Sequence, residues 1–204
     1  LAMLHVATDS EDEWVDFPGV RSTLERWKLI PQGSPSSAVG ELGLNIRKVV
    51  TRSPNPVRSC LDYLERHPAD LIVLAVRHHE GRMRWLDRSV GRPIARGAGQ
   101  MTLFIPHGAE GFVSQADGSI SLRSILIPVA SKPRPQPAVD AVARLIRTLE
   151  LPAGKVTLLH AGSATGMPPV EIPGDTGWGW DRVTRDGDPE EMILQTASDL
   201  AADM

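Results

Sequence analysis

Four short, unbroken apolar runs constrain the fold of this 204-residue chain more than any other feature. They occupy residues 2–8, 71–76, 101–105 and 125–129. Such runs are typical of buried parallel strands, because helices on both faces of the sheet leave neither face in water. Residues 46–51 and 156–160 are weaker strand candidates.

Amphipathic segments separate these runs and predict helices. Residues 56–67 place apolar side chains at helical spacing, with Asn55 at the N-cap and Pro56 at the first helical position. Residues 137–149 carry a second stripe at the same spacing. The alternation of strand and helix predicts an α/β fold with parallel strands.

An internal repeat predicts two units of one architecture. The sequence Val-Thr-Arg-Ser-Pro-Asn-Pro at residues 50–56 recurs as Val-Thr-Arg-Asp-Gly-Asp-Pro at residues 183–189. The match continues without a gap, so that Asp70 corresponds to Asp203. Asp188 and Pro189 should therefore begin a helix as Asn55 and Pro56 do.

A second, separate match links the histidines His5 and His160. Leu4-His5 recurs as Leu159-His160, at a different offset because the loops between differ in length. The repeat indicates that both histidines occupy equivalent strand ends. A shared structural hydrogen bond explains them better than catalysis.

The two predicted units are joined by a short connection. We expect a first unit at residues 1–107, a linker at residues 108–123 and a second unit at residues 124–204. The linker should contain a small hairpin, with Asp117-Gly118 supplying the positive φ angles of its turn. The repeat also implies that the first unit lacks its first strand and helix and the second its last two strands, as in a fragment of a longer chain.

Composition narrows the classes of partner. The formal net charge is −3, so no general attraction to nucleic acid is implied. The longest apolar run falls far short of the roughly 20 residues that span a bilayer, so no membrane segment is expected. Cys60 is the only cysteine and cannot form an intrachain disulfide, which agrees with a cytoplasmic location.

Residues 70–106 combine two buried strands with a polar loop between them. The loop contains Gly81 and several arginines, and Ser89 stands where a helix should begin. Parallel sheets build phosphate pockets from a strand, a glycine-containing loop and a helix N-terminus. This stretch therefore predicts an anion site at the end of the strand at residues 71–76.

These motifs resemble the universal stress protein family in its tandem form. The resemblance rests on Asp-Leu-Ile-Val-Leu-Ala at residues 70–75, on Gly81, on Ser89-Val90 and on Ile-Leu-Ile-Pro-Val at residues 125–129. It implies a doubly wound parallel sheet with strand order 3-2-1-4-5 in each unit. It also implies a homodimer, or pairing of the two units, through the last strand, which carries Met101, Leu103 and Ile105.

The resemblance further implies a nucleotide pocket, since many family members bind ATP. Its residues in this sequence are Ala75, Arg77, His78, Gly81, Arg88, Ser89 and Val90. Two loop glycines of the family are replaced by His78 and Arg88, so the pocket is expected to be degenerate. The leading interpretation is a non-enzymatic stress-response or regulatory module that requires no cofactor and acts on an unknown protein partner.

Two other functions stay open at this point. The arginines of residues 77–96 could replace backbone contacts to phosphate, which predicts an ATP-binding sensor or a slow ATPase. A solvated helix face and loop, with Glu80 and Asp87 as partners of these arginines, is the preferred interpretation, and an anion other than a nucleotide is a further alternative. Regulatory domains of transporters also occur in the family, which gives the third possibility.

Two further pairs of side chains, one of histidines and one of tryptophans, could in principle form binding sites. His78-His79 is not expected to bind a metal, because adjacent side chains in an extended segment point apart and no further ligands have suitable spacing. Trp178 and Trp180 could form an exposed patch for a partner, but packing over a sheet edge is the preferred interpretation.

Overall fold

The computed structural model describes residues 1–7, 17–76, 90–106, 108, 111–174 and 176–204. It divides into two compact units, each of which is described by itself. Unit 1 comprises residues 1–110 and 115–117, and unit 2 comprises residues 111–114 and 118–204. No helix of the described part of the chain is long and apolar enough to cross a membrane.

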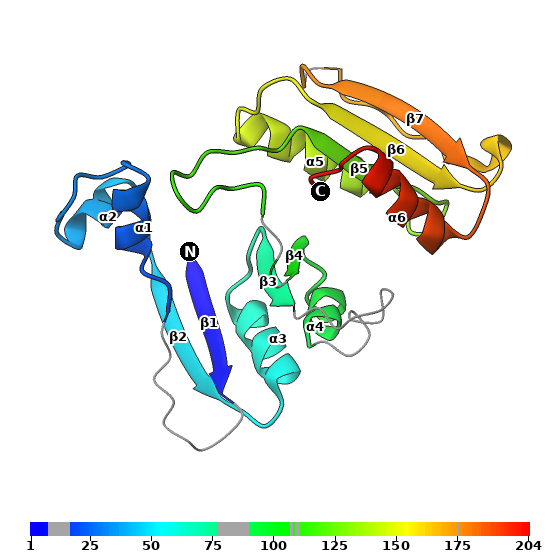
Figure 1. Ribbon diagram of the computed structural model, residues 1–204. Coiled ribbons are helices and arrows are strands. Elements are labelled where there is room, and N and C mark those ends of the chain that lie inside the picture. The colour runs from blue at the N-terminus through cyan, green and yellow to red at the C-terminus, as the bar shows by residue number, and fades with distance from the viewer. Residues whose placement is uncertain (8–16, 77–89, 107, 109–110, 175) are drawn as a thin grey trace. The chain divides into compact units, whose positions relative to one another are not determined.

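Unit 1 alternates strands with helices (Figure 1). Its elements are β1 (Ala2–Ala7), α1 (Val20–Arg26), α2 (Ser37–Glu41), β2 (Arg47–Arg52), α3 (Pro56–Arg66), β3 (Ile72–Val76), α4 (Gly91–Ala98) and β4 (Thr102–Pro106). β1 pairs with β2 and β3 pairs with β4, both in parallel. Among the described residues these pairs form two separate two-stranded sheets.

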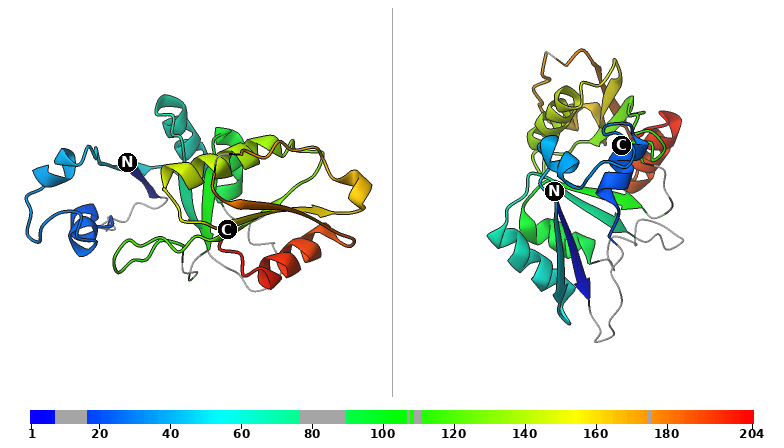
Figure 2. Two further views of the ribbon diagram at one scale, coloured as in Figure 1. Left: turned by 90° about the horizontal axis from the view of Figure 1, so that it is seen from above. Right: turned by 90° about the vertical axis from the view of Figure 1, so that its left-hand side faces the viewer.

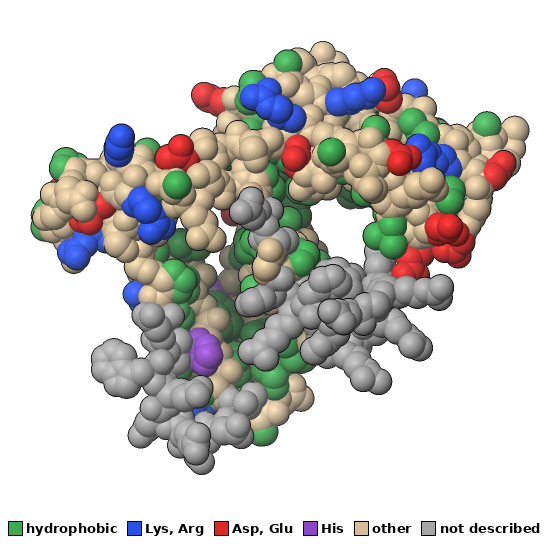
Figure 3. All heavy atoms as spheres, viewed as in Figure 1, with side chains coloured by type: hydrophobic (Ala, Val, Ile, Leu, Met, Phe, Trp, Pro, Cys, Tyr) green, Lys and Arg blue, Asp and Glu red, His purple; other side chains and the backbone are tan. Residues whose placement is uncertain are grey.

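The strands of unit 1 are less buried than the sequence predicted. Val73 and Leu71 leave 52% and 41% of their surfaces exposed, and α3 has no buried residue despite its apolar stripe. The prediction of strands covered on both faces is therefore wrong for this unit. Hydrophobic side chains accordingly reach the surface over β3 and β4 in the space-filling view (Figure 3).

The helices α1 and α2 form a small lobe that the sequence analysis did not predict. Leu24, Ile30 and Val39 are buried together there, packed against Ile46. Both helices are short, and neither begins with a side-chain hydrogen bond, although Ser36 is the N-cap residue of α2.

Unit 2 contains one parallel sheet. Its elements are β5 (Ser124–Pro128), α5 (Gln136–Thr148), β6 (Lys155–Ala161), the 3₁₀ turn η2 (Ala164–Gly166), β7 (Gly179–Arg185) and α6 (Pro189–Asp199). The strand order is β5-β6-β7, with every pair parallel. The two views of Figure 2 and Figure 1 place α5 and α6 on opposite faces of this sheet.

The core of unit 2 lies between α5 and the sheet. Ile125 and Ile127 of β5 and Val156 and Leu158 of β6 pack against the α5 stripe, which includes Ile146. These side chains alternate along their strands, as expected when one face of a sheet receives one helix. The α/β fold and the parallel strands predicted from the sequence are thus present.

The tryptophans of unit 2 belong to its core. Trp178 is buried, and the Trp180 indole donates a hydrogen bond to Thr176 Oγ1 at 3.1 Å. Both side chains pack in or against the cluster under α5. The interpretation as packing residues is confirmed.

The predicted helix starts are confirmed in both units. Asn55 Oδ1 accepts a hydrogen bond from Arg58 N at 3.0 Å at the start of α3. Asp188 Oδ1 accepts from Glu190 N and Glu191 N at 3.0 and 3.2 Å at the start of α6. In each case a proline follows the capping residue.

The predicted hairpin in the connection is present, but its turn differs. Val113 and Ile120 form an antiparallel bridge, and Ser114 N donates to Ser119 O. Gly118 has a φ of +76°, whereas Asp117 is not among the residues with positive φ. The loop between the bridged residues is longer than a two-residue turn, so one left-handed position is enough.

Candidate functional site

The predicted anion site lies where β3 ends and α4 begins. Ala75 pairs with Ile105 near the carboxyl end of β3. Val90 is the N-cap residue of α4, with φ −62° and ψ −19°, and 51% of its surface is exposed. These two residues are the members of the predicted set that the structure places. Arg77, His78, Gly81, Arg88 and Ser89 lie outside the described residues.

The start of α4 has limited capacity to hold an anion. Val90 has no polar side chain, and α4 has no side-chain cap. Pro93 lies in the first turn and carries no N–H, so this helix offers an anion fewer backbone donors than one without proline there. Arg92 and Arg96 add positive charge along the same helix.

The strand order of unit 1 bears on the carboxyl end of β3 as a ligand position. β1 pairs with β2 and β3 pairs with β4, and no described strand joins these two pairs into one sheet. Open α/β sheets bind ligands outside the carboxyl ends of strands where the direction of connection reverses, and such a reversal requires one continuous sheet. The predicted residues 75–90 begin at this end of β3.

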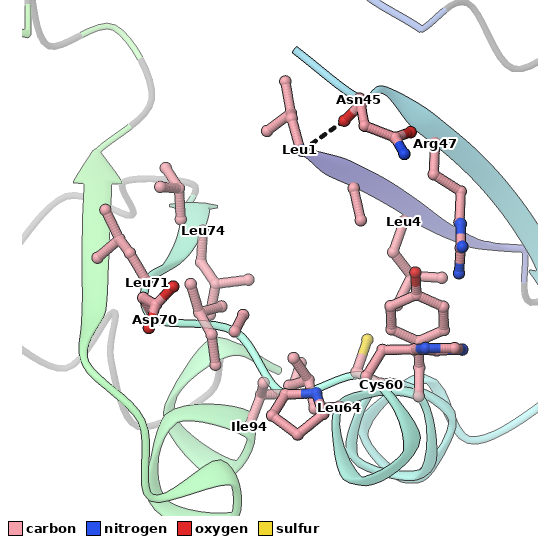
Figure 4. A pocket seen from close by; sticks show the side chains of 17 residues that line it. Leu1, Leu4, Asn45, Arg47, Cys60, Leu64, Asp70, Leu71, Leu74 and Ile94 are labelled. Carbon is pink, nitrogen blue, oxygen red and sulfur yellow. Dashed lines mark hydrogen bonds between the residues drawn. The ribbon is translucent and has the colours of Figure 1, made fainter. Parts of the chain in front are cut away.

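A cavity of about 650 Å³ lies elsewhere in unit 1 (Figure 4). It is lined by residues of β1, β3, α3 and α4, together with Asn45, Arg47 and Asp70 at the starts of strands. Neither Ala75 nor Val90 lines it. The cavity and the predicted anion site are therefore different features of unit 1.

Cys60 lies in the wall of this cavity. Burial raises the pKa of its thiol, because a thiolate is poorly solvated there. A thiol of this kind packs as a small apolar side chain rather than acting as a nucleophile. The sequence pattern did not predict this cavity.

The two histidines of the repeat do not occupy equivalent positions. His160 Nδ1 lies 3.1 Å from Val129 O, so its structural hydrogen bond is confirmed. The ladders pair Ala7 with Arg52 and Ala161 with Arg185, which sets His160 opposite Thr184 but His5 opposite Val50. By strand pairing, the counterpart of His160 in unit 1 is therefore Val6, one residue after His5. Successive side chains of a strand point to opposite faces of the sheet, so His5 and His160 lie on different faces of their sheets. The predicted equivalence of His5 and His160 is therefore wrong.

Metal chemistry gains no support from the described residues. Within them, no group of three or more His, Cys, Asp or Glu side chains could hold a metal ion. His78 and His79 lie outside the described part of the chain.

No protein-family model matches the chain, and no curated protein or solved structure is significantly similar to it. Function must therefore be argued from the residues and the geometry of the two units.

Proposed function

We propose that this chain is a tandem universal stress protein-like regulatory module without enzymatic activity. One observation carries the proposal: in both units two paired parallel strands are followed by a helix, with α1 and α2 between the strands of unit 1 and the short turn η2 between those of unit 2. β1, β2 and α3 in unit 1 correspond to β6, β7 and α6 in unit 2, with parallel pairing in each. Both helices begin with a side-chain cap and a proline. This order supports the tandem architecture that the sequence motifs resemble.

Several features support a degenerate nucleotide pocket in unit 1. His78 and Arg88 stand where the family has loop glycines, and a side chain at either place obstructs close approach of the backbone to phosphate. Val90 and Pro93 weaken the start of α4 as a phosphate cradle. We infer that the protein works through contacts with other proteins.

The outer strand β4 is the surface we propose for pairing with another unit or a second chain. Met101 and Ile105 are exposed, and Leu103 is partly buried. The edge of β4 away from β3 has no strand partner among the described residues. An open strand edge with apolar side chains supports strand-to-strand pairing.

Calorimetric titration with ATP and Mg²⁺ tests the degenerate pocket. We expect no binding tighter than a Kd of about 10 µM. Ser89→Ala and Gly81→Ala variants should titrate like the unaltered protein. Binding tighter than this limit that is lost in either variant would contradict the proposal.

A nucleotide-binding sensor is the second candidate. Arg92 and Arg96 on α4, the helix that follows β3, favour it, because the planar guanidinium group of arginine binds phosphate well. It predicts that nucleotide co-purifies with the protein and is lost in Ser89→Ala. Chromatography of a heat-denatured extract of freshly purified protein distinguishes the two candidates, since the regulatory module should release no nucleotide.

A further inference from the structure

Unit 1 contains an apolar cavity bounded by two unpaired strand edges. β1 pairs only with β2 and β3 only with β4 among the described residues, so the edges of β1 and β3 that face the cavity have no strand partner. Residues from both strands line the cavity, whose volume is about 650 Å³. Unpaired N–H and C=O groups along a strand edge can accept another strand.

The walls of the cavity are apolar where side chains point inward. Figure 4 shows Leu4 of β1 and Leu74 of β3 on opposite sides, with Leu64, Cys60 and Ile94 from the helices between them. Polar side chains come from the starts of strands, at Asn45, Arg47 and Asp70, and from the carboxyl end of α3, at Tyr63 and His67. An occupant that lies between β1 and β3 must therefore present apolar side chains to Leu4, Leu64 and Leu74.

In unit 2, the strand edge that corresponds to the unpaired edge of β1 is paired with another strand. There β6 pairs with β7 on one side and with β5 on the other. Val129 N, just after β5, donates to Leu159 O at 2.8 Å. β1 corresponds to β6, because each is the first of two paired strands that precede a capped helix. No strand in the described part of unit 1 corresponds to β5.

An aspartate marks the same place in both units. Asp203 Oδ2 accepts hydrogen bonds from Arg123 N and Ser124 N, at 2.7 and 2.8 Å, at the start of β5. Its own N–H donates to Ser124 O at 2.8 Å. Asp70 is the counterpart of Asp203 in the sequence match, and it is exposed with no hydrogen-bond partner among the described residues.

The exposed apolar side chains of Leu71 and Val73 indicate that a helix accompanies the strand that would fill the cavity. Ile72 is buried and Leu74 partly buried, whereas Leu71 and Val73, which alternate with them along the chain and also line the cavity, are exposed. In unit 2 the face opposite α6 is covered by α5, the helix that follows β5. A strand followed by an amphipathic helix would cover both the cavity and these exposed side chains.

We propose that unit 1 binds a strand–helix segment with the chemistry of β5 and α5, inserted parallel to and between β1 and β3. The strand carries a short run of uncharged apolar residues, and its first N–H groups donate to Asp70. The helix presents an aliphatic stripe to Leu71 and Val73. The inference rests on the comparison of the two units and stands whether or not the proposed function is correct.

A synthetic peptide with the sequence of residues 122–149 is the probe. Cys60 reports occupancy, because it is the only cysteine of the chain and lies in the cavity wall. We expect saturating peptide to slow the reaction of Cys60 with a thiol reagent about tenfold. The peptide with Ile125→Asp and Ile127→Asp, which keeps the length but not the apolar strand, should leave the rate unchanged.

Two protein variants sharpen the test. Asp70→Asn removes the proposed acceptor and should weaken peptide binding about tenfold. Asp62→Asn removes an exposed carboxylate from α3 and should have no effect. Equal slowing by both peptides, no slowing at all, or equal binding by both variants would overturn the proposal. Protection of Cys60 that rises with protein concentration in the absence of peptide would also overturn it, since the occupant would then be a second copy.

Discussion

Gly154 lies where the start of β6 comes closest to its neighbours. A Cβ built on this residue would lie 2.6 Å from Arg123 O and 2.6 Å from Trp178 Cη2. One of these contacts is with backbone and the other with a buried indole, so neither can move aside easily. Gly154 is therefore required for close packing at this point.

Gly154→Ala should destabilise unit 2 by about 1–3 kcal/mol, because a methyl group would overpack the site. Urea denaturation of the variant measures the loss. Gly179→Ala is the matched control, since the nearest atom to its Cβ would be Gly154 O at 3.9 Å. Equal stability of the two variants would show that Trp178 repacks without cost.

The Cys60 thiol gives a pH-dependent prediction. Burial raises the pKa of this thiol, so the folded protein should react with a thiol reagent only at higher pH than the unfolded chain does. Measuring the rate of the thiol reaction against pH, with and without urea, tests whether the folded protein reacts at higher pH than the unfolded chain.

The same shift has a consequence for stability. Between the thiol pKa of the unfolded chain and the higher pKa of the folded chain, the folded state binds more protons. The free energy of unfolding must therefore fall as pH rises through this window. Cys60→Ser should remove that part of the pH dependence, and an unchanged slope would contradict the assignment.

At the scale of elements, α3 and α6 begin in the same way, each with a capping side chain followed by a proline. Asn55→Ala and Asp188→Ala each remove the side-chain acceptor of a helix start. Each should destabilise its own unit by about 1 kcal/mol. Hydrogen exchange resolved along the chain measures the effect, with faster exchange confined to α3 in one variant and to α6 in the other. Spreading of either effect to the other unit would show that the two units unfold together.

Elements with strong local signals were predictable from sequence. Asn55-Pro56 and Asp188-Pro189 each combine a capping side chain with a proline, and both helices begin there. The short helices α1 and α2 carry no such signal and were missed. The register of His5 was also missed by one residue, because pairing is set by contacts across the sheet rather than by the local sequence.

At the scale of the molecule, the pattern of apolar runs predicted the fold class. It did not predict which strands would be buried. The runs of β3 and β5 look alike in sequence, yet Ile125 is buried whereas Val73 is exposed. The burial of a strand depends on the strands and helices that surround it, and these cannot be predicted from the residues of that strand alone. For the same reason the sequence indicated the end of β3 as an anion site but not the cavity beside Cys60.

The two units also differ in how much apolar surface they bury, and this predicts their order of unfolding. Unit 2 has a continuous core under α5, whereas the buried cluster among the described residues of unit 1 lies in the lobe of α1 and α2, with Ile72 and Ile94 buried outside it. Since burial is the main stabilising contribution, unit 1 should unfold at lower urea concentration than unit 2. Amide exchange across a urea series measures each unit separately.

Paired truncations test the reason for this order. Ile146 is 2% exposed in α5, so Ile146→Ala should cost about 2–5 kcal/mol and lower only the midpoint of unit 2. Leu64 of α3 is only partly buried beside the open cavity. Leu64→Ala should therefore cost clearly less, about 1 kcal/mol, because its neighbours already leave space around it. Equal losses would mean that α3 has a covered apolar face in solution, as it would with a strand held between β1 and β3.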